Sequence, residues 1–107
     1  MIDRPMKPQW FQILLALSDQ PLHGYGIQRA VLDRTDDQMR LWPAMLYRSL
    51  ARLEDEGLIQ QVEAPEDEPD DERRQYYALT AAGAERLREE ADLLARWAEA
   101  ARSATSG

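Results

Sequence analysis

The clearest hydrophobic pattern in the chain lies in residues 43–58. Leu46, Leu50 and Leu53 are spaced i, i+4 and i+7, which places all three in one stripe along an α-helix. Small residues, a phenol and two guanidinium groups occupy the opposite face: Ala44, Tyr47, Arg48, Ala51 and Arg52. The pattern predicts a helix over about 43–56 that buries its leucines and exposes its arginines.

The ends of this helix and the segment before it carry further structural signals. Pro43 suits the first helical turn, where its missing N–H has no partner to lose. Gly57 stands where a helix commonly ends in the left-handed conformation. A second helix is predicted to begin at His23–Gly26, because Ile27 and Val31 follow one turn apart. Two helices joined in this way are typical of a helix-turn-helix.

Helices are also predicted at both ends of the chain. Pro8–Asp19 carries two apolar faces, so we expect it to meet its own core on one side and the C-terminal helix or a second subunit on the other. Thr80 is a good N-cap for a helix from Ala81 to roughly Ala101, and Ser103 should begin a frayed tail. Apolar residues of this last helix recur in steps of three and four, as in a helix that pairs with another helix: Ala84, Leu87, Ala91, Leu94, Ala98 and Ala101.

Two short segments predict a β-hairpin. Leu58–Glu63 and Arg73–Leu79 carry the β-branched and aromatic residues typical of strands. Ala64–Glu72 between them holds two prolines and six acids, which is typical of a solvated loop. Tyr76 and Tyr77 should point to opposite sides of the second strand. A helix-turn-helix followed by a hairpin is a winged helix.

Composition and charge narrow the class of protein. The chain has 107 residues, enough for one domain, and no cysteine, which excludes disulfides and thiolate metal sites. It shows neither a signal peptide nor an apolar run long enough to span a bilayer, so we expect a cytoplasmic protein. The net charge of −7 is concentrated in residues 63–80, which hold seven acids and two bases. The acidity is therefore local and leaves the helix-turn-helix close to neutral.

The sequence lacks the residue patterns of a catalytic or metal site. It has no nucleophile–base pair, no cluster of metal ligands and no glycine-rich phosphate loop, so we expect no enzymatic activity, no cofactor and no metal. His23, the only histidine, is expected to cap or pack a helix. The glycines at positions 24 and 26 suggest a close approach of backbone at a helix start.

Three blocks at fixed spacings resemble the PadR-like transcriptional regulators. They are His23-Gly24-Tyr25; Leu41-x-Pro43-x-x-Leu46-Tyr47-Arg48-x-Leu50-x-Arg52-Leu53-Glu54-x-x-Gly57-Leu58-Ile59; and Arg74-x-Tyr76-Tyr77-x-Leu79-Thr80-x-x-Gly83. The resemblance runs from about Phe11 to Gly83. It implies a homodimeric winged-helix repressor with a recognition helix in the major groove and a wing on the DNA backbone or minor groove. The short C-terminus is similar to the smaller subgroup, whose single C-terminal helix packs against the partner's first helix.

We therefore expect a mainly α fold with a small β-hairpin. Residues 1–80 would form a winged helix-turn-helix DNA-binding domain, and residues 81–107 a C-terminal dimerisation helix with its frayed tail. The expected partners are double-stranded DNA with a palindromic operator and a second copy of the chain, with no membrane. The alternative is a winged-helix protein-interaction module that uses its acidic wing to contact a basic protein.

Seven residues are expected to contact DNA: Ala44, Tyr47, Arg48, Arg52, Arg73, Arg74 and Tyr76. Tyr47 and Arg48 suit phosphates or base edges, since an arginine can bridge the N7 and O6 of guanine. Arg52, one turn further along, is expected to hold a phosphate, and the three residues at the base of the wing to contact the backbone. The alternative for each arginine is a solvated surface charge.

The sequence departs from the family pattern at two places. Family members usually carry a small polar residue before the proline and Gly-Thr after it, whereas here Trp42 precedes Pro43 and Ala44-Met45 follow. The change removes an N-cap hydroxyl and a phosphate-contacting threonine, and it places a bulky indole where the helix meets DNA. The six acids of the loop would oppose docking on phosphates, so the tip of the wing should point away from DNA or stay mobile.

A small planar aromatic effector is a further hypothesis. Some members of the family bind flat aromatic compounds between tryptophans at the dimer interface. In this chain Trp10, Phe11, Leu93 and Trp97 are the corresponding candidates if the C-terminal helix crosses the partner's first helix. The simpler alternative is that these side chains fill the interface as hydrophobic bulk.

Overall fold

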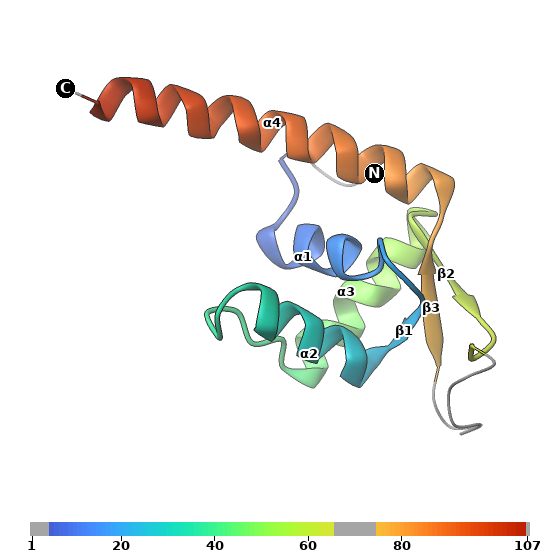
Figure 1. Cartoon of the computed structure of the whole chain (residues 1–107). Helices are drawn as coiled ribbons and strands as arrows, with labels where there is room; N and C mark the ends of the chain where they lie inside the picture. The colour runs from blue at the N-terminus through green and yellow to red at the C-terminus, as the bar shows by residue number, and fades with distance from the viewer. Residues whose placement is uncertain (1–4, 66–74, 107) are drawn as a thin grey trace.

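The computed structural model describes residues 5–65 and 75–106, and within them it is mainly helical with one small antiparallel sheet. The elements follow in the order α1 (Pro8–Ala16), β1 (Leu22–His23), α2 (Gly24–Arg34), α3 (Pro43–Asp55), β2 (Ile59–Val62), β3 (Tyr76–Leu79) and α4 (Ala81–Thr105). Helices α1, α2 and α3 form a bundle with the sheet at one side, and α4 runs across the top of α1 (Figure 1). This arrangement is the predicted winged helix.

Helix α3 has the ends and the buried stripe that its sequence predicts. Leu46, Leu50 and Leu53 are at most 1% exposed and join the core with α1 and α2. Pro43 occupies the first turn, and Trp42 is the N-cap residue without a side-chain cap, as expected from the missing hydroxyl. Gly57 has a φ of 75°, a conformation in which a side chain would be strained.

The start of α2 confirms the capping role expected of the only histidine. The Nδ1 atom of His23 accepts a hydrogen bond from the Gly26 backbone N–H at 3.1 Å, which satisfies one of the free donors of the first turn. The imidazole also packs edge-on against the Tyr76 ring at 5.2 Å between centroids. His23 is therefore held on both sides as a structural group.

The sheet has one strand more than the predicted hairpin. Its order is β1-β3-β2, so the central strand β3 pairs with β2 and also with the two-residue strand β1. Leu22 lies opposite Tyr77, and His23 lies opposite Tyr76. The hairpin pairs antiparallel with Ile59 opposite Leu79.

Helix α4 begins at a hydrogen-bonded cap. The Thr80 hydroxyl accepts from the Gly83 N–H at 2.9 Å and donates to the Gly57 carbonyl at 2.7 Å. Such a cap contributes about 1 kcal/mol, and here it also ties α4 to the end of α3. A methyl group on Gly83 would overlap the Leu58 carbonyl, so glycine permits the close approach of helix and strand.

A buried ion pair fixes the first half of α4 to the domain. Glu90 is 1% exposed and pairs with the Arg86 guanidinium at 2.8 Å. Its second oxygen accepts the Met6 backbone N–H at 3.1 Å. A carboxylate can be buried when it is paired and hydrogen-bonded in this way. The contact holds the segment before α1 against α4 and so fixes the direction in which the rest of α4 extends.

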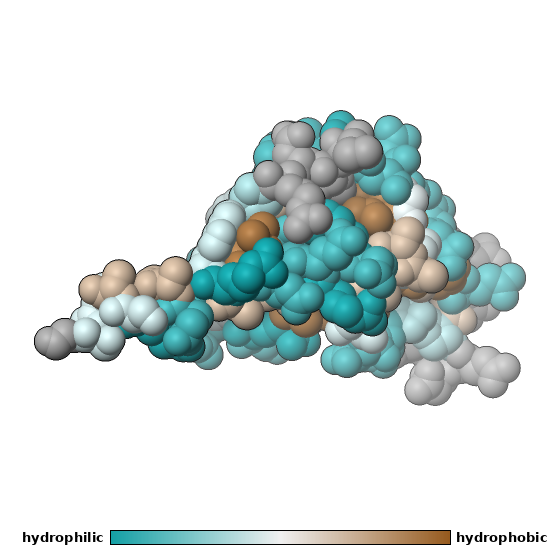
Figure 2. All heavy atoms as spheres, turned by 90° about the horizontal axis from the view of Figure 1, so that it is seen from above, coloured by the Kyte–Doolittle hydropathy of each residue, from teal (hydrophilic) through white to brown (hydrophobic). Residues whose placement is uncertain are grey.

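The second half of α4 projects from the domain (Figure 1). The helix continues to Thr105. The prediction of a frayed tail beginning at Ser103 is therefore wrong for residues 103–105. The apolar residues that recur along α4, here called the seam, fall into two groups. Ala84 and Leu87 are half-buried against the domain, whereas Leu94 and the alanines around it are exposed. Viewed from above, the projecting end has hydrophobic residues along one side and hydrophilic ones along the other (Figure 2). No helix in residues 5–65 and 75–106 has the length and apolarity needed to cross a membrane.

Candidate nucleic-acid interface

The outer face of α3 presents the side chains that the sequence predicts to face outward. Ala44, Tyr47, Arg48 and Arg52 are exposed, on the side opposite the buried leucines. Because Leu46, Leu50 and Leu53 fix the rotation of the helix, the polar face cannot turn inward without exposing the core. The helix therefore offers one rigid row of an aromatic hydroxyl, two guanidinium groups and small residues.

Tyr47 is exposed and yet held in place by α2. A Cβ atom added to Gly24 would lie 2.5 Å from the Tyr47 hydroxyl oxygen, so the phenol crosses directly over the first residue of α2. The close backbone approach expected at this glycine is thereby confirmed. The phenol thus lies against the start of α2 while the side chain stays half exposed.

The two arginines of α3 differ in their surroundings. Among the described residues Arg48 has no ion-pair partner, and its stem lines a hollow of about 220 Å³ together with Lys7 and Trp10. The ammonium of Lys7 lies 5.0 Å from the centre of the Trp10 ring. Arg52 forms a pair with Glu56 at 3.6 Å, half-exposed and one turn along the helix. Such a surface pair is weak and can be exchanged for a phosphate.

Tyr76 corrects one of the predicted contacts. The side chain is 3% exposed and packs against His23, so it is part of the interior and is not presented to DNA. Alternation along the strand placed Tyr76 opposite Tyr77, but His23, its cross-strand neighbour on β1, packs against the Tyr76 ring on that side of the sheet. Arg73, Arg74 and the acidic loop of residues 66–72 lie outside the described residues.

The candidate effector residues lie on two elements. Trp10 and Phe11 on α1 are half-buried and pack against the core, and Trp10 lines the hollow beside Arg48. Leu93 on α4 is half-buried, whereas Trp97 is 50% exposed on the projecting half of the helix. In the single chain Trp97 is thus a solvent-facing indole.

Sequence reasoning missed a neighbouring group of exposed aromatic and basic side chains. The members of this aromatic–arginine surface are Tyr25, Arg29, Arg40 and Trp42, which come from α2 and the segment before α3. The Tyr25 hydroxyl accepts a hydrogen bond from Arg29 at 3.3 Å, and the Arg40 guanidinium lies 5.7 Å from the centre of the Trp42 ring. Tyr25 and Trp42 are 60% and 63% exposed, an unusual exposure for aromatic side chains. The sequence pointed only to Trp42, as a bulky indole at the start of the recognition helix.

Two pKa shifts reflect the electrostatics of this region. The hydrogen bond to Tyr25, then the charges of that residue, Asp33 and Asp37, raise the pKa of Arg29, so its guanidinium stays protonated. Burial raises the pKa of the Tyr77 phenol, with smaller contributions from Glu54 and Tyr47. Neither shift brings a group into the range of a general acid or base at neutral pH. Residues 5–65 and 75–106 hold no group of three or more side chains suited to a metal ion.

Comparison with known proteins agrees with this geometry. The profile of the transcriptional regulator PadR-like family matches residues 13–89, which span α1 to the first part of α4. An uncharacterized 37.1 kDa protein in transposon TN4556 of Streptomyces fradiae is 40% identical over 84 residues. The match covers 78% of this chain and 22% of that protein, so the chain spans about a fifth of the length of that relative.

Two solved structures are similar over almost the whole chain. A transcriptional regulator from Clostridium thermocellum superposes with a TM-score of 0.77 at 23% identity, over 92% of this chain and 90% of that one. A PadR family transcription regulator from Clostridium difficile superposes with a TM-score of 0.72 at 25% identity, over 94% of this chain and 100% of that one. The agreement establishes the fold, including the long C-terminal helix.

Proposed function

This chain belongs to the PadR-like family of transcriptional regulators, and from that premise we propose that it is a homodimeric repressor that binds a palindromic operator. The observation that carries the proposal is the outer face of α3, where Tyr47, Arg48 and Arg52 stand exposed on a helix anchored by buried leucines. A helix of this kind fits the major groove of B-DNA, which is about 12 Å wide.

Each exposed residue of α3 would make a different contact with DNA, according to its position along the helix. Ala44, in the first turn, allows the helix to approach the floor of the groove closely. Arg48 has its donors free of ion pairs among the described residues and would bridge the N7 and O6 of a guanine. Arg52 would exchange its weak pair with Glu56 for a phosphate. We further propose that Arg73 and Arg74 contact the backbone from the base of the wing.

Dimerisation through α4 is the second part of the proposal. Residues 1–80 would act as the DNA-binding unit and residues 81–107 as the dimerisation helix. The exposed half of the apolar seam supports this division, because Leu94, Ala98 and Ala101 form an apolar stripe that the described part of the chain leaves uncovered. A second copy would cover it and place two α3 helices in a symmetric arrangement.

Selection of bound duplexes from random DNA tests the proposal. We expect palindromic sequences whose half-sites are about ten base pairs apart, since a two-fold dimer presents its recognition helices one helical turn apart. Binding to the selected duplex should weaken steeply as the salt concentration rises, because bound phosphates release counterions. If the chain is instead a protein-interaction module, it will show no preference among duplexes.

A planar aromatic effector that releases the operator is the remaining part of the proposal. The half-exposed Trp97 supports it, because in a dimer this indole would lie near α1 of the other subunit. We expect planar hydrophobic cations or phenolics to quench tryptophan fluorescence and to dissociate the operator, and a Trp97→Phe substitution to reduce the quenching. Fluorescence that no such compound changes would remove the basis for an effector site.

A further inference from the structure

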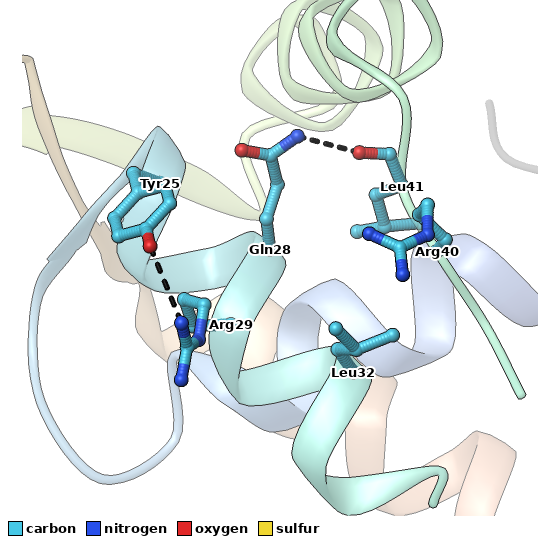
Figure 3. A pocket seen from close by; sticks show the side chains of 6 residues that line it. All are labelled: Tyr25, Gln28, Arg29, Leu32, Arg40 and Leu41. Atoms are coloured by element: carbon cyan, nitrogen blue, oxygen red, sulfur yellow. Dashed lines mark hydrogen bonds between the residues drawn. The ribbon is translucent and has the colours of Figure 1, made fainter. Parts of the chain in front are cut away.

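A hollow lies beside the N-terminal end of α3, between α2 and the segment that leads into the recognition helix (Figure 3). Its volume is about 220 Å³, and it is lined by Tyr25, Gln28, Arg29, Leu32, Arg40 and Leu41. Arg29 and Arg40 come from the two different walls and are both exposed to solvent. Two guanidinium groups and a phenol thus surround a depression whose floor is partly apolar.

The spacing between the two walls is set by one hydrogen bond. The side-chain amide of Gln28 donates to the Leu41 carbonyl at 2.6 Å, which ties the segment before α3 to the middle of α2 (Figure 3). Each arginine is in addition held by an aromatic neighbour, Arg29 by the Tyr25 hydroxyl and Arg40 by the Trp42 ring. These contacts orient the guanidinium groups while using few of their donors, since an arginine carries five N–H groups.

We propose that this hollow binds a phosphate of the DNA backbone next to the site that α3 reads. The inference rests on the proposed function and adds a contact outside the recognition helix. Leu41 is two residues before α3, so the hollow lies at the end of that helix. When a helix lies in a groove about 12 Å wide, a sugar–phosphate strand passes close to that end. A charged pair of guanidinium groups is the chemistry that proteins use to hold a phosphate diester.

Arg29 and Arg40 should not contribute equally to binding of the phosphate. The negative charges of Asp33 and Asp37 act on the Arg29 guanidinium and offset part of its attraction for a phosphate. Arg40 has no ion-pair partner among the described residues and stacks on an apolar ring. Arg40 should therefore supply the larger share of the attraction, and Arg29 should position the phosphate from the opposite wall.

The test measures binding of Arg40→Ala and Arg29→Ala/Arg40→Ala to the duplex selected by the wild-type protein and to variants of that duplex. We expect the double variant to bind all of these duplexes about tenfold more weakly, with an unchanged order of preference. The slope of log K against log salt should fall by about 0.9 for each half-site. Arg34→Ala, on the far end of α2 and paired with Asp19 at 4.0 Å, is the matched control and should leave affinity and slope unchanged.

A chemical change in the DNA locates the contact. Neutral methylphosphonate linkages, introduced one at a time beside each half-site, should weaken wild-type binding at one position and leave the double variant insensitive there. Equal affinity and slope for the double variant and Arg34→Ala would overturn the phosphate site, as would a changed sequence preference, which would mean base contacts. A wild-type protein that binds no duplex selectively would instead disprove the proposed function, so the two failures are distinguishable.

Discussion

Replacing Arg48 and Arg52 together with alanine is expected to abolish specific DNA binding and to leave the folded dimer intact. A bidentate arginine–guanine contact contributes roughly 1–3 kcal/mol, and a two-fold dimer makes it twice. Loss of the Arg52 phosphate contact adds to this, so we expect the apparent dissociation constant for the operator to rise at least ~100-fold. Stability should change little, because both side chains are exposed and the pair of Arg52 with Glu56 contributes less than about 1 kcal/mol.

A gel-shift titration with the selected operator measures the loss, and thermal denaturation and sedimentation check fold and assembly. Arg34→Ala/Arg96→Ala is the matched control, since it removes the same two charges from exposed positions away from α3. The control should bind as the wild type does. Affinity of the α3 variant within a few-fold of the control would show that this helix is outside the binding site.

The elements predicted from the sequence are those whose signal is local. The stripe of Leu46, Leu50 and Leu53, the capping threonine at position 80 and the glycine at position 57 each determine a feature within one turn of their own position. Strand β1 was not predicted, because two residues carry no periodicity and pair only when β3 is beside them. The burial of Tyr76 was missed for the same reason, because His23 of β1 packs against its ring.

The extent and the burial of α4 were predicted only in part. Its heptad spacing describes one continuous seam, and the spacing cannot tell which residues the chain itself covers. In the structure Gly83, Ala84 and Leu87 pack within the domain, and only the later residues of the seam are exposed. The reason is the contact with α1, which is reinforced by the buried Glu90.

The candidate site also has one part that the sequence predicts and one part that only the fold reveals. The arginines of α3 could be found because they share one helix face with a fixed period. The aromatic–arginine surface could not, because it combines α2 with the segment before α3, and the hydrogen bond from Gln28 to Leu41 that joins them is a tertiary contact. A pattern within one element predicts which face is exposed, whereas a surface built from two elements needs the fold.

Two negative charges in the exposed part of the α4 seam are expected to produce a folded monomer that binds the operator poorly. Leu94→Glu/Ala98→Glu places carboxylates on the apolar stripe, where a symmetric dimer would bury them against their own copies. Helix formation should persist, because glutamate is a good helix former and both positions are exposed in the single chain. A monomer engages one half-site only, so we expect operator affinity to fall by about 10²–10⁴-fold.

Arg96→Gln/Ser103→Glu is the matched control, because it makes the same change of net charge at exposed positions of the same helix, away from both the seam and Trp97. Sedimentation should give a monomer for the seam variant and a dimer for the control and the wild type. Binding of the seam variant to a single half-site should equal that of the wild type, since α3 is untouched. A seam variant that remains dimeric would show that the subunits meet elsewhere, and a wild type that is monomeric at high concentration would exclude the dimer altogether.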